Sequence, residues 1–129
     1  MENRGVLCIV IVFILTEFWA CQIDVRADEG VCTQEFQSIG LKVLGDSLTD
    51  FYTVRLSTSD TIRRSTGVES QTHWYLVLDD SYQRQLANKQ ESFRFIGKQG
   101  QRVLIQQDYI IAADHCHVKK VSGISEIQL

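Results

Sequence analysis

The stretch Asp114-His115-Cys116-His117-Val118-Lys119-Lys120-Val121 has the most specific pattern in the chain, and Ser125-Glu126-Ile127-Gln128-Leu129 follows it after a short break. Side chains alternate between the two faces of an extended strand, so His115 and His117 are expected on one face and Cys116 on the other. A cysteine on the outer face, with polar side chains facing inward, is typical of a small ligand-binding barrel. We therefore expect an all-β protein whose interior is lined by this strand.

Working outward from this stretch, the sequence predicts strands that follow one another with turns at regular spacing. Aromatic and β-branched residues place strands at 49–56, 72–78, 92–96, 102–107, 109–121 and 125–129. The last two are expected to pair antiparallel around Ser122-Gly123, and 97–100 is expected to form a hairpin turn. Residues 32–48 predict a short helix or turn, and 57–70 a polar loop or weak edge strand. Strands in this order close into an up-and-down antiparallel barrel or fold as a sandwich, and we expect the barrel.

The N-terminal 27 residues have the features of a secretory signal peptide. Arg4 precedes the uninterrupted apolar run 6–15, which is shorter than the roughly 20 residues that span a bilayer. Cleavage after Ala27 has small residues, Val25 and Ala27, at the positions just before the cut where signal peptides prefer them. Cleavage after Ala20 or Cys21 places Phe18 or Trp19 at one of these positions. We expect a secreted protein with a single domain formed by residues 28–129.

The composition excludes several classes of partner. With 44% hydrophobic and 22% charged residues, the chain is typical of a globular protein. A net charge of -3 argues against nucleic acid or an anionic membrane as the main partner. The sequence shows no nucleophile motif, phosphate-binding loop or paired carboxylates, so we expect neither an enzyme nor a cofactor. His115, His117 and Asp114 lack a further ligand at a recognisable zinc spacing, and no metal is expected either.

Two cysteines remain in the expected mature chain, Cys32 and Cys116. In an oxidising compartment free thiols are unusual. The two cysteines either pair with each other, or each has a partner beyond Leu129, and the sequence leaves both alternatives open.

The segment from 114 to 127 resembles the tick salivary lipocalins of the histamine-binding type. Cys116-His117-Val118 and Glu126-Ile127 are similar to that family's signature of Cys-Asp-Val, a spacer, Glu-Leu-Trp/Tyr and a later cysteine. The run His115-Cys116-His117-Val118 is even more similar to a soft-tick branch that scavenges lipid mediators and inhibits complement. Looser similarity extends over most of residues 28–129, at Cys32 with Phe36, at 52–60 and around Trp74.

The departures from the family pattern bear on its expected fold and ligand. His117 stands where the family has an aspartate, and Gln128 where it has an aromatic residue. The family's final cysteine, closing strands and C-terminal helix have no counterpart, and the edge at 127–129 is left unpaired. We therefore expect an incomplete lipocalin-like barrel, from a truncated or alternatively spliced member.

Five residues are candidates for ligand binding. The resemblance assigns Glu126 as the carboxylate for an amine, since a buried cation needs a counter-charge. The candidates His115 and His117, with Lys119 expected on the same face, favour an acidic lipid instead. Trp74 is a candidate for stacking on the ligand, and Arg63 resembles an arginine near the barrel mouth. A solvent-facing or core position is the alternative for each of these side chains.

The resemblance implies a secreted salivary protein that sequesters a small host inflammatory mediator and so evades host haemostatic and immune responses. Histamine or a related biogenic amine is the expected ligand. A fatty-acid-derived mediator of the leukotriene or thromboxane type is the first alternative. A host complement or platelet protein, bound through exposed loops such as 57–70, is the second.

Overall fold

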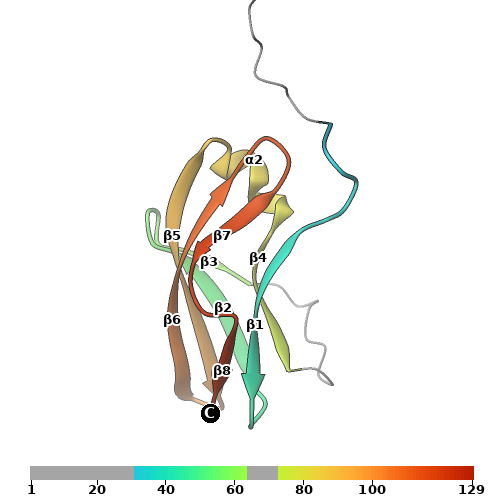
Figure 1. Ribbon diagram of the computed structural model, residues 1–129. Coiled ribbons are helices and arrows are strands. Elements are labelled where there is room, and N and C mark those ends of the chain that lie inside the picture. Colours follow the sequence, from blue (N-terminus) through green and yellow to red (C-terminus); the bar gives the residue numbers. More distant parts are fainter. Residues whose placement is uncertain (1–30, 64–72) are drawn as a thin grey trace, which may run out of the picture. The chain divides into compact units, whose positions relative to one another are not determined.

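The computed structural model of the chain describes residues 31–63 and 73–129, and strands make up most of this part (Figure 1). The all-β class is thus confirmed. The strands are β1 (Ser38–Leu44), β2 (Asp50–Arg55), β3 (Asp60–Ile62), β4 (Trp74–Asp79), β5 (Lys89–Gln99), β6 (Arg102–Ala113), β7 (Val118–Ser122) and β8 (Glu126–Gln128). A short 3₁₀ helix, η1 (Asp80–Tyr82), and one turn of α-helix, α2 (Gln83–Leu86), connect β4 to β5.

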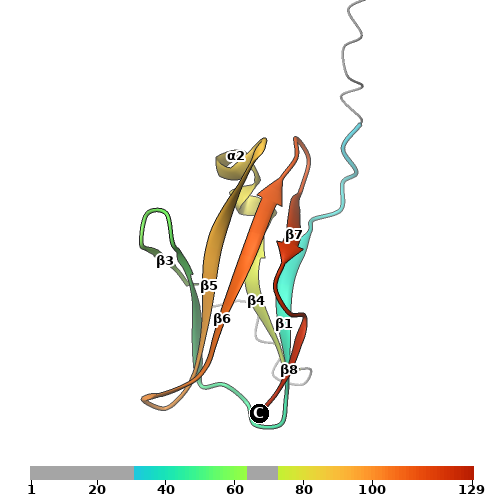
Figure 2. The same cartoon turned by 60° about the vertical axis from the view of Figure 1, so that its left-hand side comes forward.

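The strands form two sheets. One has the order β4-β1-β8 and the other the order β3-β2-β5-β6-β7. The β5–β6 hairpin is the longest pairing and is prominent in both views of the ribbon (Figures 1 and 2). Because the ladders of the described strands form two separate sheets, they do not confirm the expected barrel closure.

One hydrophobic core joins the inner faces of the two sheets. Alternate residues of β1, namely Ile39, Leu41 and Val43, are buried, and they share the core with Phe93 and Phe95 of β5. Since side chains of a strand alternate between faces, this pattern gives each sheet one buried face. The arrangement corresponds to the sandwich alternative of the sequence-based prediction.

The helix or turn expected over residues 32–48 is wrong, because Ser38–Leu44 is strand β1. The buried positions of β1 alternate with Gly40 and Lys42, which lie on the outer face. A period of two is a strand pattern, but the extra apolar Leu44 and the glycine made it resemble a helical spacing. The loop or weak edge strand expected after residue 57 contains β3 at the edge of its sheet, and residues 64–72 lie outside the described part.

The expected order of pairing is also corrected. β1 pairs antiparallel with β4, and β2 pairs with β5, so the strands do not form a simple meander. The C-terminal strand β8 pairs parallel with β1 instead of antiparallel with β7, and it is therefore paired along one side. Lys42 lies opposite Glu126 in this register, and Val43 lies opposite Ile127.

The predicted strand at 109–121 is interrupted by a turn at 114–117. The Asp114 carboxylate accepts hydrogen bonds from the backbone N–H groups of Cys116 and His117, each at 2.8 Å. An aspartate side chain that binds the backbone two and three residues ahead stabilises a turn in place of a strand ladder. The prediction that His115 and His117 alternate with Cys116 along a strand is therefore wrong.

The hairpin turn between β5 and β6 lies later than predicted. Gly97 belongs to β5, and the chain turns at Gly100-Gln101, where Gly100 has a φ of 59°. A Cβ atom on Gly97 would lie 2.7 Å from Cδ1 of Leu48. Gly97 thus permits close packing, whereas Gly100 supplies the positive φ that a tight turn requires.

No helix in the described part of the chain is long and apolar enough to span a membrane. The predicted signal peptide at 1–27 lies outside the described residues.

Candidate functional site

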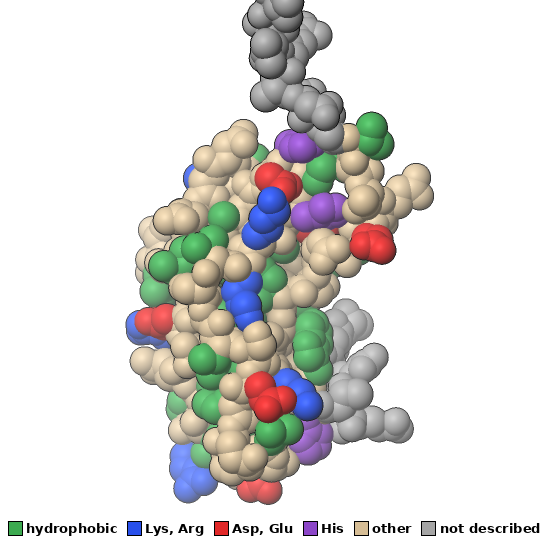
Figure 3. Space-filling view, in the orientation of Figure 1, with side chains coloured by type: hydrophobic (Ala, Val, Ile, Leu, Met, Phe, Trp, Pro, Cys, Tyr) green, Lys and Arg blue, Asp and Glu red, His purple; other side chains and the backbone are tan. Residues whose placement is uncertain are grey.

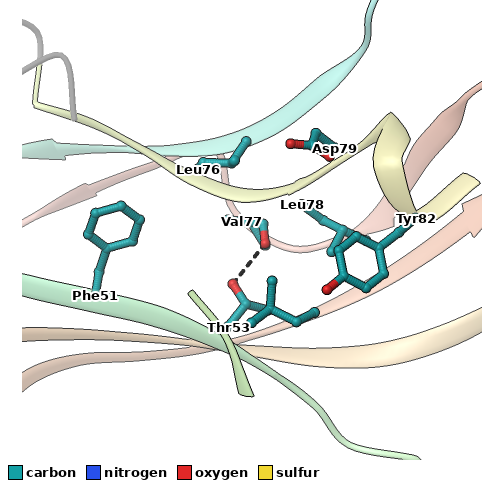
Figure 4. A pocket seen from close by; sticks show the side chains of 8 residues that line it. Phe51, Thr53, Leu76, Val77, Leu78, Asp79 and Tyr82 are labelled. Atoms are coloured by element: carbon teal, nitrogen blue, oxygen red, sulfur yellow. Dashed lines mark hydrogen bonds between the residues drawn. The ribbon is translucent and has the colours of Figure 1, made fainter. Parts of the chain in front are cut away.

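A small hollow lies between the two sheets where β2 of one faces β4 of the other, and its enclosed space of about 10 Å³ for the centre of a water-sized sphere holds about one water molecule (Figure 4). Its walls are mainly apolar, with three polar side chains among them. The lining residues are Phe51, Thr53, Ile62, Leu76, Val77, Leu78, Asp79 and Tyr82. Ligand sites typically combine apolar walls with a few convergent polar groups, so this hollow is the candidate site.

Thr53 fixes the distance between the two sheets at the hollow. It is 1% exposed, and its hydroxyl donates a hydrogen bond to the Val77 carbonyl oxygen at 2.8 Å (Figure 4). Because β2 and β4 are not neighbours in either sheet, this bond links them where no backbone ladder does. Phe51, two residues earlier on the same face of β2, packs its ring edge-on against Tyr75 with ring centroids 5.3 Å apart.

Asp79 is the acidic residue of the hollow wall. It is 3% exposed, and its Oδ1 accepts hydrogen bonds from the backbone N–H and the hydroxyl of Ser81, at 3.0 and 2.6 Å. These bonds cap η1, which in turn positions Tyr82 at the same wall. The Asp79 carboxylate is thus engaged in the cap of η1, on the side of β4 that lies away from Thr53 in Figure 4.

A second polar cluster lies beyond Thr53 on the same face of β2. Arg55 binds Glu91 of β5 through two hydrogen bonds of 2.7 Å, and both side chains are almost buried, with 12% and 13% exposed. Hydrogen bonds from Arg55 and then Ser57 lower the pKa of Glu91 to about 2. Since Gln85 also binds Arg55, the cluster holds β2, β5 and α2 together and leaves Glu91 ionised at neutral pH.

A third cluster, which we call the Asp80 clasp, consists of Asp80 with Gln37, His117 and Val118. The Asp80 carboxylate accepts from the backbone N–H groups of Gln37 and Val118 at 2.7 and 2.8 Å, and it lies 2.7 Å from Nδ1 of His117. Burial raises the pKa of Asp80, but these hydrogen bonds outweigh it and hold the pKa below its usual value. The clasp connects three segments: the residues before β1, the start of η1 and the start of β7.

The clasp lies beside the Cys32–Cys116 disulfide, whose Cα atoms are 5.3 Å apart. The structure thus supports one of the two alternatives that the sequence left open, the pairing of these cysteines with each other. Asp114 completes this region, because its carboxylate binds the Cys116 and His117 N–H groups and lies 2.5 Å from Nζ of Lys119. The pKa of Asp114 lies well below the usual range. The hydrogen bond from Lys119 is the largest cause, and the hydrogen bonds from the two backbone N–H groups come next.

The residues predicted to bind a ligand do not converge on one site. Glu126 is half-exposed and forms an ion pair with Lys42 at 3.1 Å. His115 is exposed in the turn before β7, and His117 faces Asp80. None of the five predicted binding residues is among those that line the hollow.

Trp74 and Arg63 also lie away from the hollow. The Trp74 indole packs on Gly40, on the outer face of β1. A Cβ atom added to Gly40 would lie 2.0 Å from the Trp74 ring. Arg63 binds Asp50 at 2.8 Å, and its guanidinium carbon lies 4.5 Å from the centre of the Tyr52 ring. Both side chains therefore have partners on the outer faces of the sheets.

The residues that line the hollow were not predicted from the sequence. Strand alternation over 50–55 would have placed Phe51 and Thr53 on one face. Asp79 was interpreted only as the end of a strand, because a local pattern does not reveal which residues line a hollow between two distant strands.

No protein-family model, curated protein or solved structure matches the chain.

Proposed function

We propose that the protein is a secreted, lipocalin-like binding protein that sequesters a small host mediator, with histamine or a related biogenic amine as its ligand. The single observation that carries this proposal is the hollow with mainly apolar walls, whose lining residues include the acidic Asp79. A hollow that widens to admit an amine would give it an apolar surface, with a carboxylate close by as a counter-charge. Binding is stoichiometric, and removal of the mediator from solution blocks its signal.

Secretion is supported by two features of the chain. The apolar run at 6–15 is typical of a signal peptide, and the Cys32–Cys116 disulfide suits an oxidising compartment. The lipocalin-like part of the proposal rests on the resemblance at 114–127.

The small size of the hollow favours an amine over a fatty-acid-derived mediator. Its enclosed space is about that of one water molecule, so the hollow must widen to admit either ligand, and the smaller ligand requires less widening. The basic face that favoured an acidic lipid is also neutralised, because Lys119 pairs with Asp114 and His117 with Asp80.

Calorimetric titration of the oxidised full chain with histamine tests the proposal. We expect saturable heat from the wild type and a loss of at least about tenfold in affinity for Asp79→Asn, since a tenfold change corresponds to about 1.4 kcal/mol of a charge interaction. Glu126→Gln is the matched control: it removes one carboxylate in the same way, but on the outer surface, and should leave the affinity unchanged.

Circular dichroism of each variant must first show that it is folded. A folded wild-type chain that gives no heat with histamine contradicts the proposal. Binding of a hydroxylated eicosanoid alone would assign the protein to lipid scavenging. No heat with either ligand would favour the binding of a host protein through exposed loops.

A further inference from the structure

Three potential metal ligands come together beside the Asp80 clasp. The Sγ atoms of Cys32 and Cys116 and a ring nitrogen of His115 all lie within 4.8 Å of one another. Histidine, acidic and basic side chains gather on the surface at this end of the molecule (Figure 3). No metal was expected from the sequence, because the residues near His115 in the chain lack a further ligand and Cys32 is 84 residues away from Cys116.

Hydrogen bonds also join the segments that carry these ligands, in addition to the disulfide. Thr33, next to Cys32, binds Nε2 of His117 through its hydroxyl at 3.1 Å, and Gln37 binds Asp80. On the other side, Asp114 fixes the turn that carries His115 and Cys116. The two cysteine segments therefore have non-covalent links on either side of the sulfur atoms.

We propose that the dithiol form of the chain binds Zn²⁺ through the thiolates of Cys32 and Cys116 and the imidazole of His115. Thiolate and imidazole are the ligands that Zn²⁺ prefers, and binding releases the two thiol protons to solvent. Water takes the fourth position, because the His117 ring is engaged by Asp80 and Thr33.

The zinc site and the disulfide are alternative states of the same two sulfur atoms. Every chain is synthesised with free thiols, so the dithiol form precedes the disulfide. In that form the metal ion links the segment before β1 to the β6–β7 turn, as the disulfide does later. This inference is independent of the proposed ligand in the hollow, which is lined by other residues.

The test is a titration of the full chain with Co²⁺, a spectroscopic stand-in for Zn²⁺, under a phosphine reductant. Cys8→Ser and Cys21→Ser are introduced in every sample, so that Cys32 and Cys116 are the remaining thiols. We expect a thiolate-to-cobalt absorption band that Zn²⁺ displaces, and no band from the oxidised chain. His115→Ala should weaken Co²⁺ binding at least about tenfold, because loss of even an outer-shell partner of a metal ligand costs 10–100-fold.

Two histidine variants serve as comparisons. His73 binds Ser47 elsewhere in the molecule, so His73→Ala should leave the cobalt affinity unchanged. His117→Ala should retain the absorption band. Its affinity for Co²⁺ should be closer to that of the chain with all three histidines than to that of His115→Ala. The proposal is overturned by a reduced chain without a band, by a band that survives Cys32→Ser with Cys116→Ser, or by an unaltered affinity in His115→Ala.

Discussion

The segment before β1 and the segment after β7 attach to the body of the protein in different ways. Residues 31–37 are all exposed, with Val31 at 98% and Phe36 at 64%, so they bury little apolar surface. They are attached by the Cys32–Cys116 disulfide and by hydrogen bonds of Gln37 with Asp80 and of Thr33 with His117.

The C-terminal segment is attached by backbone pairing and partial burial. Lys42 N–H donates to the Ser125 carbonyl oxygen and Leu129 N–H to the Leu44 carbonyl oxygen, each at 2.9 Å, and Ile127 packs against the core. One end of the fold thus depends on covalent and polar links, whereas the other depends on a short parallel ladder.

The largest expected effect comes from removing the disulfide. Cys32→Ser with Cys116→Ser should lower the free energy of unfolding by about 4–5 kcal/mol, because the cross-link no longer restricts a long loop in the unfolded chain. Urea unfolding of the folded variant and the wild type measures the difference. Hydrogen exchange should show that amides before β1 lose protection first, and an equal early loss in β8 would refute the distinction between the two segments.

Asp80→Asn should lower the free energy of unfolding by about 2 kcal/mol at neutral pH, because hydrogen bonds to a charged acceptor are lost. The folded-state pKa of Asp80 is lowered, so its contribution is present above the ordinary carboxyl pKa near 4 and disappears as the pH falls through the folded value. The difference between wild type and variant should therefore shrink in acid. The exposed Asp46→Asn is the control, and a difference that persists or grows in acid would contradict this role.

Ile127→Ala tests the attachment of the C-terminal segment that carries β8. The side chain is only partly buried, so a loss of about 1–2 kcal/mol is expected, less than for a fully buried isoleucine. Hydrogen exchange should reveal reduced protection at the Lys42 and Leu129 amides, which bond across the β1–β8 pairing. If the residues before β1 lost protection to the same extent, the two attachments would not be independent.

Glu126→Gln should have the smallest effect. The Lys42–Glu126 pair has both side chains 51% exposed, and such surface pairs contribute less than about 1 kcal/mol. The difference in free energy of unfolding should fall further at high salt, because salt screens exposed charges. A salt-insensitive loss above 2 kcal/mol would show that β8 depends on this ion pair and not on its ladder.

The sequence predicted β2 and β4, which are rich in aromatic and β-branched residues, and the β5–β6 hairpin, whose two strands are adjacent in the chain. β1 was missed because Gly40 lies under Trp74, a packing requirement that a one-dimensional pattern does not reveal. The parallel partner of β8 was missed because it lies more than eighty residues earlier, at Lys42–Leu44.

The candidate site was harder to predict than the strands. Cys32 and Cys116 were recognisable as residue types, and their pairing was one of two alternatives. The hollow lies where Thr53 of one sheet donates a hydrogen bond to Val77 of the other, and no local sequence pattern predicts a contact between these two strands. His115 and His117 were assigned to a shared face because the turn made by Asp114 was not recognised.

The parallel pairing of β1 with β8 also constrains how the chain folds. β5 and β6 are adjacent in sequence and close a short turn, so their hairpin can form with little loss of loop entropy. The sheet β4-β1-β8 requires strands far apart in the chain, and such contacts form slowly. During synthesis, β1 must wait for nearly the whole chain to emerge before its sheet is complete, and its β8-facing edge stays open to other strands until then.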